Sequence, residues 1–494
     1  MEALDWLVIG VFFLALIGII VWVVRQKQND SADYFLGGRD ATWLAIGASI
    51  FASNIGSEHL IGLAGAGASS GMAMAHWEIQ GWMILILGWV FVPFYTRSMV
   101  YTMPEFLERR YNPQSRTILS VISLVSYVLT KVAVTVYAGG LVFQQVFGIK
   151  ELWGIDFFWI AAIGLVVLTA LYTIFGGMKS VLYTSVLQTP ILLLGSLIIL
   201  VLGFKELGGW DEMMRVCGAV TVNNYGDTMT NLIRSNDDAN FPWLGALIGS
   251  AIIGFWYWCT DQFIVQRVLS GKNEMEARRG TIFGAYLKLL PVFLFLIPGM
   301  IAFALHQKYI GAGGEGFLPM LANGTANADA AFPTLVAKLL PAGVKGLVVC
   351  GILAALMSSL ASLFNSSAML FTIDFYKRFR PETPEKKLVG IGQVATVVIV
   401  ILGILWIPIM RSVGDVLYTY LQDVQSVLAP GIAAAFLLGI CWKRTSAQGG
   451  MWGLIAGMVI GLTRLGAKVY YSNAGEVADS TFKYLFYDMN WLFF

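Results

Sequence analysis

Ionisable side chains occur at five places where the surrounding sequence is strongly apolar: Glu58, Glu78, Lys131, Asp261 and Lys288. In a membrane such a group costs on the order of 3 kcal/mol or more without a partner, so we expect each to have one. A carboxylate and an ammonium can also both hydrogen-bond to hydroxyl groups. Glu78 with Lys288 is therefore a candidate pair across a polar cavity that binds a neutral ligand. A purely structural ion pair between helices is the alternative.

The stretch "WYWCTDQFIVQR" (256–267) places four polar or charged side chains directly behind three aromatic ones. Trp256 to Trp258 either belong to an aromatic belt at the membrane surface or stack on the C–H face of a sugar. We favour the sugar, because a polar break in mid-span follows them. Asp261 and Arg267 do not share a helical face. We therefore expect Arg267 at the cytoplasmic end, Asp261 in an inner-cavity or structural role, and the polar tail along an inner exit.

The segment "LAALMSSLASLFNSS" (353–367) brings Ser358, Ser359 and Ser362 into an apolar helix. Serine hydroxyls often bond back to the carbonyl four residues earlier and need no other role. Alternatively, two adjacent hydroxyls, together with carbonyls freed by a broken helix, form an uncharged oxygen cage for a small hard cation such as sodium. Both interpretations are open from the spacing alone.

These residues lie in a chain whose composition is that of an integral membrane protein. Of 494 residues, 57% are hydrophobic and 13% are charged, which is more apolar surface than a soluble protein can bury. Apolar runs of about 20 residues, the length of a spanning helix, recur along the chain. We expect twelve helices, near 5–25, 43–67, 78–101, 117–146, 157–175, 181–204, 243–263, 280–305, 344–375, 387–410, 415–441 and 447–469.

Lysine and arginine concentrate in alternate loops, at 25–39, 97–116, 267–279, 377–387 and 443–444. Such loops face the cytoplasm, which places the N-terminus outside. The first helix lacks a basic leader and a cleavage site, so we expect it to be retained. The last residues, "KYLFYDMNWLFF", are typical of the first turns of a further helix, which suggests a cut chain or a missing tail. The four cysteines offer no external disulfide pair.

Two predicted helices are interrupted near their middles. "ASIFASNIGSEHLIGLAGAG" (48–67) carries polar residues from Asn54 to His59, and the helix of 243–263 carries Asp261. Unwinding in hydrocarbon leaves backbone groups without partners unless protein, water or a ligand satisfies them. The two helices begin successive blocks of five, and matching breaks of this kind indicate the central site of a secondary transporter. Close helix packing is the alternative, chiefly for glycines such as Gly65.

Six long motifs carry a family resemblance: "FASNIGSEHLIGLAGAGASSG", "YTMPEFLERRY", "WYWCTDQFIVQR", "GAYLKLLPVFLFLIPGMI", "LAALMSSLASLFNSS" and "AAAFLLGICWKR". Together they resemble the sodium/solute symporter family, and within it the sodium/glucose cotransporter branch, from about residue 5 to 470. The resemblance implies an all-α integral membrane protein of leucine-transporter type. It would be one polytopic domain over 1–494, with a five-plus-five inverted repeat (about 43–204 and 243–441) and extra flanking helices.

The resemblance also implies site residues. The sugar site would use Asn54, His59, Glu78, Tyr257, Trp258, Lys288 and Gln422. The outer gate would use Leu63, Trp77 and Tyr418, with Tyr257 as the inner gate. Sodium, the coupling ion, would be held by Ala52, Ile55, Ala355, Ser358 and Ser359. Two positions depart from the family: Ser185 stands where an aspartate is common, which argues against a second sodium, and Gly81 replaces a serine or asparagine near the sugar.

We therefore expect a plasma-membrane symporter, in the bacterial inner membrane, that imports a glucose- or galactose-type hexose with sodium by alternating access. A myo-inositol or polyol symporter, and a sodium-leak channel or glucose sensor, are the alternatives. The expected partners are the sugar or polyol, sodium and the lipid bilayer, with no nucleic acid and no organic cofactor. An enzyme is not expected, because no nucleophile–base pair or metal-ligand cluster is evident in the sequence.

Overall fold

A computed structural model describes residues 1–26, 30–56, 58–238, 240–321, 324–412, 417–473 and 480–489. The side chains of residues 129, 409–412, 417–424, 469 and 472–473 are not part of this description. Almost all of the described chain is helical, with one two-residue antiparallel pair of strands, β1 (Glu151–Leu152) and β2 (Ile155–Asp156), between α10 (Ala133–Phe147) and α11 (Phe157–Leu207).

The helices before this pair of strands are α1 (Ala3–Val24), α2 (Ser31–Leu36), α3 (Trp43–Asn54), α4 (Ala64–Ser70), α5 (Ala75–Ile79), α6 (Met83–Ile86), α7 (Val92–Ser98), α8 (Met103–Arg110) and α9 (Pro113–Ser126). Those after α11 are α12 (Trp210–Gly218), α13 (Trp243–Phe255), α14 (Gln262–Leu269), α15 (Glu274–Leu287), α16 (Ile297–Gly311), α17 (Ala331–Leu339), α18 (Val344–Met369), α19 (Lys377–Phe379), α20 (Glu385–Ser412), α21 (Leu417–Cys441), α22 (Ala447–Asn473) and α23 (Thr481–Lys483). Short π-helical segments join several of them, including Glu58–Leu63, Tyr127–Val132 and Trp256–Thr260.

Nine helical segments of the described residues are long and apolar enough to cross a membrane, against the twelve helices expected. The difference arises because helices merge or are cut short. The continuous helix α11 contains two predicted helices and turns at Gly177, whose φ of 54° and ψ of −150° are not helical. Helix α3 is shorter than a full span, and α21 enters this set only as Gln425–Cys441, because the side chains of its first residues lie outside the description. The remaining predicted ranges are mostly helical where the structure describes them, with a turn at Lys288–Leu289 and no helix over 99–101.

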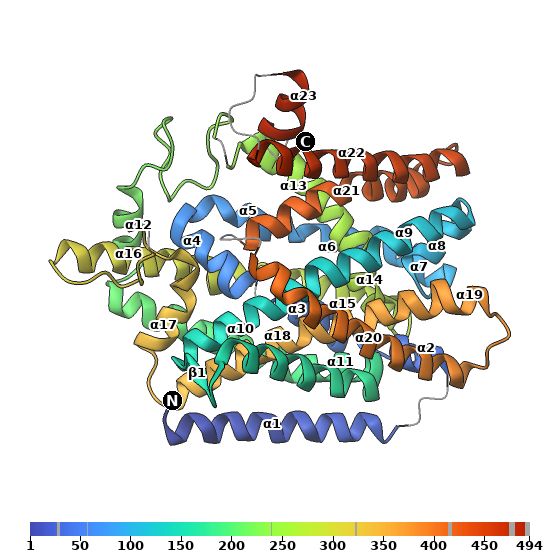
Figure 1. Cartoon of the computed structure of the whole chain (residues 1–494), viewed down its shortest axis with the longest axis horizontal. Helices are drawn as coiled ribbons and strands as arrows, with labels where there is room; N and C mark the ends of the chain where they lie inside the picture. Colours follow the sequence, from blue (N-terminus) through green and yellow to red (C-terminus); the bar gives the residue numbers. More distant parts are fainter. Residues whose placement is uncertain are drawn as a thin grey trace.

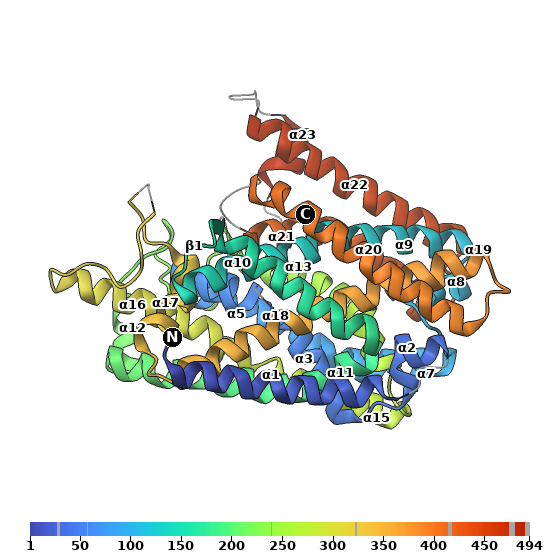
Figure 2. The same ribbon diagram turned by 60° about the horizontal axis from the view of Figure 1, so that its bottom comes forward.

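Helix α18 lies in the interior of the bundle, and α1 and α22 flank it on opposite sides (Figures 1 and 2). The apolar span that contains α18 is 89% buried, whereas that of α1 is 22% buried and leaves most of its surface for lipid. Helix α1 packs against α11 and α18, and α22 packs against α21. The serine-bearing helix is thus surrounded by protein, as a polar site inside a membrane requires.

The two ends of the bundle differ in character. Helices α12 and α17, which belong to the two longest connections, lie at the same end as the N-terminus, whereas α2, α8 and α19 lie at the other end (Figure 1). Asp5 Oδ1 accepts hydrogen bonds from the backbone N–H groups of Gly343 (2.7 Å) and Gly346 (2.8 Å). The long connections and the N-terminus therefore share one side, and the cation-rich loops around α8 and α19 share the other.

Arg267 departs from the predicted pattern of loop cations. It lies within α14 and is 1% exposed, so it is a buried helix residue and not a loop cation, while its predicted place at the cytoplasmic end stays a prediction. Its Nε donates to Ser49 Oγ (3.2 Å) and Ser53 Oγ (3.1 Å) on α3. The hydroxyl groups of α3 supply hydrogen-bond acceptors for this buried guanidinium. Against an apolar helix surface the same Nε–H group would be buried without a partner, which costs free energy.

Candidate functional site

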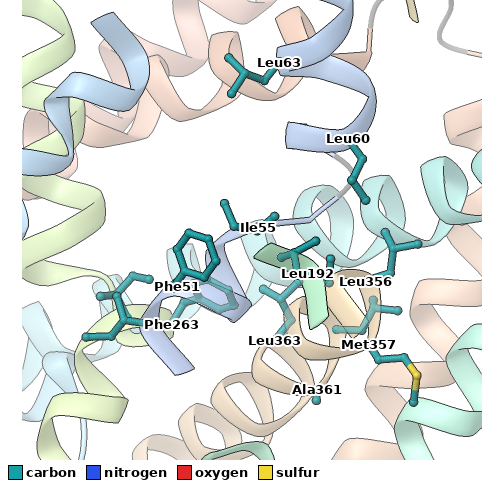
Figure 3. Close-up of a cluster of buried hydrophobic side chains, with 14 of the residues drawn as sticks. Phe51, Ile55, Leu60, Leu63, Leu192, Phe263, Leu356, Met357, Ala361 and Leu363 are labelled. Carbon is teal, nitrogen blue, oxygen red and sulfur yellow. The ribbon is translucent and has the colours of Figure 1, made fainter. Parts of the chain in front are cut away.

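The first broken helix opens immediately after Asn54, where α3 ends. Ile55 is extended (φ −80°, ψ 102°), and helical structure resumes at Glu58. In Figure 3, Ile55 lies on the stretch between the two helical ribbons, with Phe51 on one side and Leu60 at the next ribbon. The hydroxyl of Ser359 donates to the carbonyl oxygens of Ser53 (2.7 Å) and Ile55 (3.4 Å). Helix α18 thus satisfies backbone groups that the break frees.

The second broken helix ends in the π-helical segment Trp256–Thr260, and Asp261 begins a new helix. Asp261 is extended (φ −74°, ψ 128°), and its carboxylate accepts from the N–H of Phe263 as the N-cap of α14. The carbonyl of Cys259 accepts from the hydroxyl of Tyr95 (2.7 Å). An aspartate is a favoured N-cap, which explains why the sequence restarts a helix at this position.

One cavity lies between the two breaks. It is lined by Ser53, Asn54, Glu58, His59, Trp77, Glu78, Gln80, Lys131, Thr135, Ile253, Tyr257, Trp258, Phe263, Lys288, Ser359, Leu363 and Gln425. All six predicted sugar-site residues whose side chains are described are in this set. The seventh, Gln422, and the gate residue Tyr418 lie outside the described side chains. Of the other gate residues, Trp77 lines the cavity, whereas Leu63 is fully buried and does not.

The predicted Glu78–Lys288 pair is confirmed and includes His59. Lys288 Nζ lies 2.6 Å from Glu78 Oε2 and 2.8 Å from His59 Nε2. The Nε2 atom of His59 can accept from the ammonium in one tautomer and can donate to Glu78 in the other. His59 Nε2 also lies 3.2 Å from Glu78 Oε1. An acceptor, a donor and an imidazole therefore converge on one wall of the cavity.

Gly81 explains how Lys288 reaches this wall. A Cβ atom at residue 81 would lie 2.6 Å from Lys288 Cγ and 3.3 Å from its Cβ, closer than van der Waals contact allows. The absence of a side chain at Gly81 therefore makes room for the stem of Lys288. A serine or asparagine here would require the lysine to move.

A second buried ion pair lies next to the second break. Lys131 Nζ lies 2.7 Å from Asp261 Oδ2, and the hydroxyl of Tyr127 donates to Asp261 Oδ1. Four aromatic rings surround the ammonium at 4.7–5.5 Å, those of Tyr127, Trp256, Tyr257 and Phe263. Asp261 itself does not line the cavity. Of the two predicted roles for Asp261, the structural one fits this arrangement.

The polar tail of the same stretch ties α14 to its neighbours. Gln262 Oε1 accepts from the N–H of Met103 (2.8 Å), and Gln266 Nε2 donates to the carbonyl of Phe35 (2.6 Å). Both side chains are buried. The prediction that this tail lines an inner exit is therefore wrong for the described structure, because its polar atoms are engaged in packing helices together.

The predicted sodium ligands come together only in part. Ser358 Oγ lies 3.5 Å from Ser53 Oγ and 3.3 Å from Ser185 Oγ, so it faces α3 and α11. Ser362 donates back to the carbonyl of Ser358 (2.7 Å), as the simpler interpretation expects for that residue.

Ser359 contacts the predicted carbonyl of Ile55 and, more closely, the carbonyl of Ser53, which the sequence did not single out. Ala52 and Ala355 are buried on the same two helices, and no hydrogen bond among the described residues links their carbonyls to Ser358 or Ser359.

Sequence reasoning missed several lining residues. Gln80, Thr135 and Gln425 are single polar residues in apolar runs, a signal too common to select them. Glu58 also lines the cavity, but the expectation of a partner fails for it, since no hydrogen bond or ion pair involves its side chain among the described residues. Glu78, Lys131, Asp261 and Lys288 all have the partners expected.

Residues 34–457 match the sodium:solute symporter family. Sodium/myo-inositol cotransporter 2 of Homo sapiens is 38% identical over 479 residues, which cover 94% of this chain and 70% of that protein. Sodium/glucose cotransporter 2 of Rattus norvegicus is 38% identical over 512 residues, which cover 99% and 75%.

Two solved structures show the fold. A Na⁺-coupled sialic acid symporter in a substrate-bound outward-open state has a TM-score of 0.78 at 22% identity, covering 100% of this chain and 94% of that one. MhsT in complex with L-phenylalanine has a TM-score of 0.56 at 12% identity, covering 85% and 96%. The predicted leucine-transporter-type fold is therefore confirmed.

Proposed function

Because this chain belongs to the sodium:solute symporter family, and is a multi-pass membrane transporter and not an enzyme, we propose that it imports a sugar or polyol together with sodium. The observation that carries the proposal is the cavity between the two broken helices. It gathers every described residue of the sugar site expected from sequence, Asn54, His59, Glu78, Tyr257, Trp258 and Lys288. Transport by alternating access across the plasma membrane, with the N-terminus and long connections outside, completes the proposal.

The cavity chemistry suits a ring that carries several hydroxyl groups. Trp258 and Tyr257 offer aromatic faces, on which the C–H face of a sugar stacks. Lys288, Glu78 and His59 contact one another, while His59 Nδ1 has no hydrogen-bond partner among the described residues. Hydroxyl groups donate and accept, so a sugar can replace these contacts without leaving any of the three unpaired.

A glucose- or galactose-type hexose is the proposed substrate, and myo-inositol or another polyol is the second candidate. Both are six-membered rings with hydroxyl groups around the edge. Relatives named for glucose and for myo-inositol are similar to this chain to the same extent, 38% identity in each case. Direct comparison of the solutes in a transport assay separates them.

Sodium is proposed to bind at the junction of α3 and α18, to Ser358 and Ser359 with the carbonyls of Ala52, Ile55 and Ala355. Hydroxyl and carbonyl oxygens are hard ligands without charge, as used for coupling ions in broken-helix transporters. Ile55 belongs to the same break as Asn54 and His59. Sodium that fixes the backbone at Ile55 would thus fix the helix ends that present the sugar ligands, which couples the two binding events.

Two gates are proposed around the sugar. Tyr257 closes the cavity on the inner side, and Asn54 Nδ2 donates to its hydroxyl (2.9 Å), which links the two breaks directly. Leu63, Trp77 and Tyr418 are proposed for the outer side. The inverted repeats are proposed to span about 43–204 and 243–441.

Uptake into proteoliposomes tests this function. Labelled glucose, galactose and myo-inositol are offered separately, with and without an inward sodium gradient. We expect one solute to accumulate above equilibrium only when the gradient is present. Equilibration independent of sodium would instead indicate a facilitator or sensor, and sodium current without solute movement would indicate a leak channel.

Ser359→Ala supplies the matched variant for the sodium site. Loss of this hydroxyl should abolish sodium-stimulated uptake, because it removes a direct ligand, while the folded protein persists. Ser270→Ala is the control, since the hydroxyl of Ser270 bonds back to the carbonyl of Gln266 within its own helix. Unchanged sodium dependence in Ser359→Ala would remove the proposed ion site.

A further inference from the structure

Glu58 is the one cavity-lining carboxylate or ammonium of the described residues that has no partner. The other ionised groups around the cavity form two neutral pairs, Lys288 with Glu78 and Lys131 with Asp261. Glu58 follows the first break directly and lines the same cavity, and it interacts with the charges of Lys131 and Lys288 without forming a hydrogen bond or an ion pair with either. A lone carboxylate inside a membrane protein is costly and is retained mainly where it has a function.

The position of this carboxylate relative to Ser359 indicates what the function is. A Cβ atom built on Gly56 would lie 3.0 Å from Ser359 Oγ and 3.2 Å from Glu58 Oε2. Both oxygens therefore border the same point, on the side of the break where Ser359 meets the carbonyls of Ser53 and Ile55. Gly56 keeps the space between them open.

The sodium cage of hydroxyl and carbonyl groups carries no formal charge of its own. Arg267, hydrogen-bonded to Ser53 Oγ, adds a positive charge on the other side of the serine group, and Ser53 Oγ in turn lies 2.7 Å from Ser362 Oγ. A cation at Ser358 and Ser359 would therefore meet an unfavourable guanidinium field from one side. A negative charge facing Ser359 offsets this field at the ion itself.

We infer that Glu58 supplies the fixed negative charge of the sodium site and faces the sugar cavity with the same carboxylate, so that the ion and the sugar share one wall. This inference rests on the proposed function. Sodium at Ser359 draws the carboxylate toward itself and gives Glu58 the partner that it otherwise lacks. The carboxylate then faces the sugar as one half of an ion pair with sodium. Because its charge is already compensated, sugar binding costs less free energy after sodium has bound.

Sodium binding to the purified full-length protein, measured without sugar, tests the inference. Sodium-dependent thermal stabilisation in detergent gives the half-saturating concentration. Glu58→Gln keeps the size of the side chain and removes its charge. We expect it to raise the half-saturating sodium concentration by about ten- to a hundredfold, the effect of a unit charge several ångströms away in a protein interior.

Two further variants keep the result decisive. Gly56→Ala places a methyl group between Ser359 and Glu58 without changing any charge, and should raise the half-saturating sodium concentration in the same direction. Glu78→Gln removes a carboxylate from the same cavity, but from the wall that holds Lys288 and not from the point that Gly56 and Ser359 border, so it should raise the half-saturating sodium concentration clearly less than Glu58→Gln does.

Unchanged sodium affinity in Glu58→Gln would overturn the inference while leaving the proposed symport intact. An equal rise of the half-saturating sodium concentration in Glu58→Gln and Glu78→Gln would also overturn the inference. It would show that sodium responds to the total charge of the cavity and not to Glu58 in particular. Absence of sodium binding to the unaltered protein would instead overturn the proposed function. If Glu58→Gln does not fold, Gly56→Ala decides between the same outcomes.

Discussion

The two buried lysine–carboxylate pairs have nearly equal geometry but different surroundings. The Lys288–Glu78 contact is 2.6 Å and the Lys131–Asp261 contact is 2.7 Å. Both carboxylate and ammonium of the first pair line the cavity, and their nearest polar neighbour, His59, lines it too. In the second pair only the lysine lines the cavity, while aromatic rings enclose the ammonium and the carboxylate caps a helix.

This difference shows that the distance within an ion pair does not reveal its role. Lys288 and Glu78 can exchange each other for ligand hydroxyl groups, because the cavity gives a ligand access to both. The carboxylate of Asp261 makes three interactions, with Lys131, with Tyr127 and with the N-terminus of α14. We therefore assign binding to the first pair and support of the second break to the other pair.

Asp261→Ala should have the largest effect on stability. It leaves the ammonium of Lys131 buried without a counter-charge, a loss of about 3–5 kcal/mol for a broken buried pair, and it also removes the cap of α14. Thermal unfolding in detergent measures the change. Glu78→Ala is the matched control and should cost clearly less, because His59 and the cavity remain available to Lys288. Equal destabilisation of the two variants would break the distinction between the pairs.

Lys288→Ala should have the largest effect on sugar binding. A hydrogen bond to a charged group contributes about 1.5–3 kcal/mol, so affinity should fall roughly ten- to a hundredfold. Binding of the transported solute at saturating sodium, by calorimetry, measures it, with thermal unfolding as a check on folding. Full-strength binding would argue against the cavity as the sugar site, and a loss confined to stability would make this pair structural as well.

Gly81→Ala should weaken sugar binding by a smaller amount, on the order of three- to tenfold, because a methyl group displaces the stem of Lys288 without removing its charge. The solute dissociation constant again measures the change. Gly164→Ala is a control in another helix, since a Cβ atom there meets nothing within 4 Å. An unaltered dissociation constant in Gly81→Ala would mean that Lys288 adjusts freely and that its position is not set by Gly81.

Tyr257→Phe should have the smallest effect on stability. It keeps the ring over Lys131 and removes only the hydroxyl that accepts from Asn54, a hydrogen bond that contributes about 1 kcal/mol. Thermal unfolding should therefore change little, while uptake at a fixed sodium gradient changes if the bond between the two breaks holds the inner gate. Destabilisation as large as that of Asp261→Ala would show that the hydroxyl, and not the ring, supports Lys131.

Hydropathy and the two polar breaks were sufficient to predict most of the membrane helices and the cavity between the breaks, whereas the fold came from the resemblance of the long motifs to a known family. Gly177 was missed as a turn within one continuous helix, because a glycine in an apolar run has no distinct signal until its φ is known. Arg267 was misplaced, because its acceptors, Ser49 and Ser53, are more than 200 residues away in sequence. Gly81 makes room for the aliphatic part of the Lys288 side chain. This role could not be predicted, because sequence spacing does not show where that side chain lies.

The rings around Lys131 have a consequence for the rate of transport. Tyr257 is both the proposed inner gate and one of the four rings that surround the ammonium, and its centroid is the nearest, at 4.7 Å. Rotation of this side chain out of the permeation path would separate the cation from that ring, at a cost of about 0.5–2 kcal/mol. The aromatic rings around Lys131 would then raise the free-energy barrier to opening of the inner gate. Solute release to the cytoplasm would be slower, while the equilibrium affinity for the solute would not change.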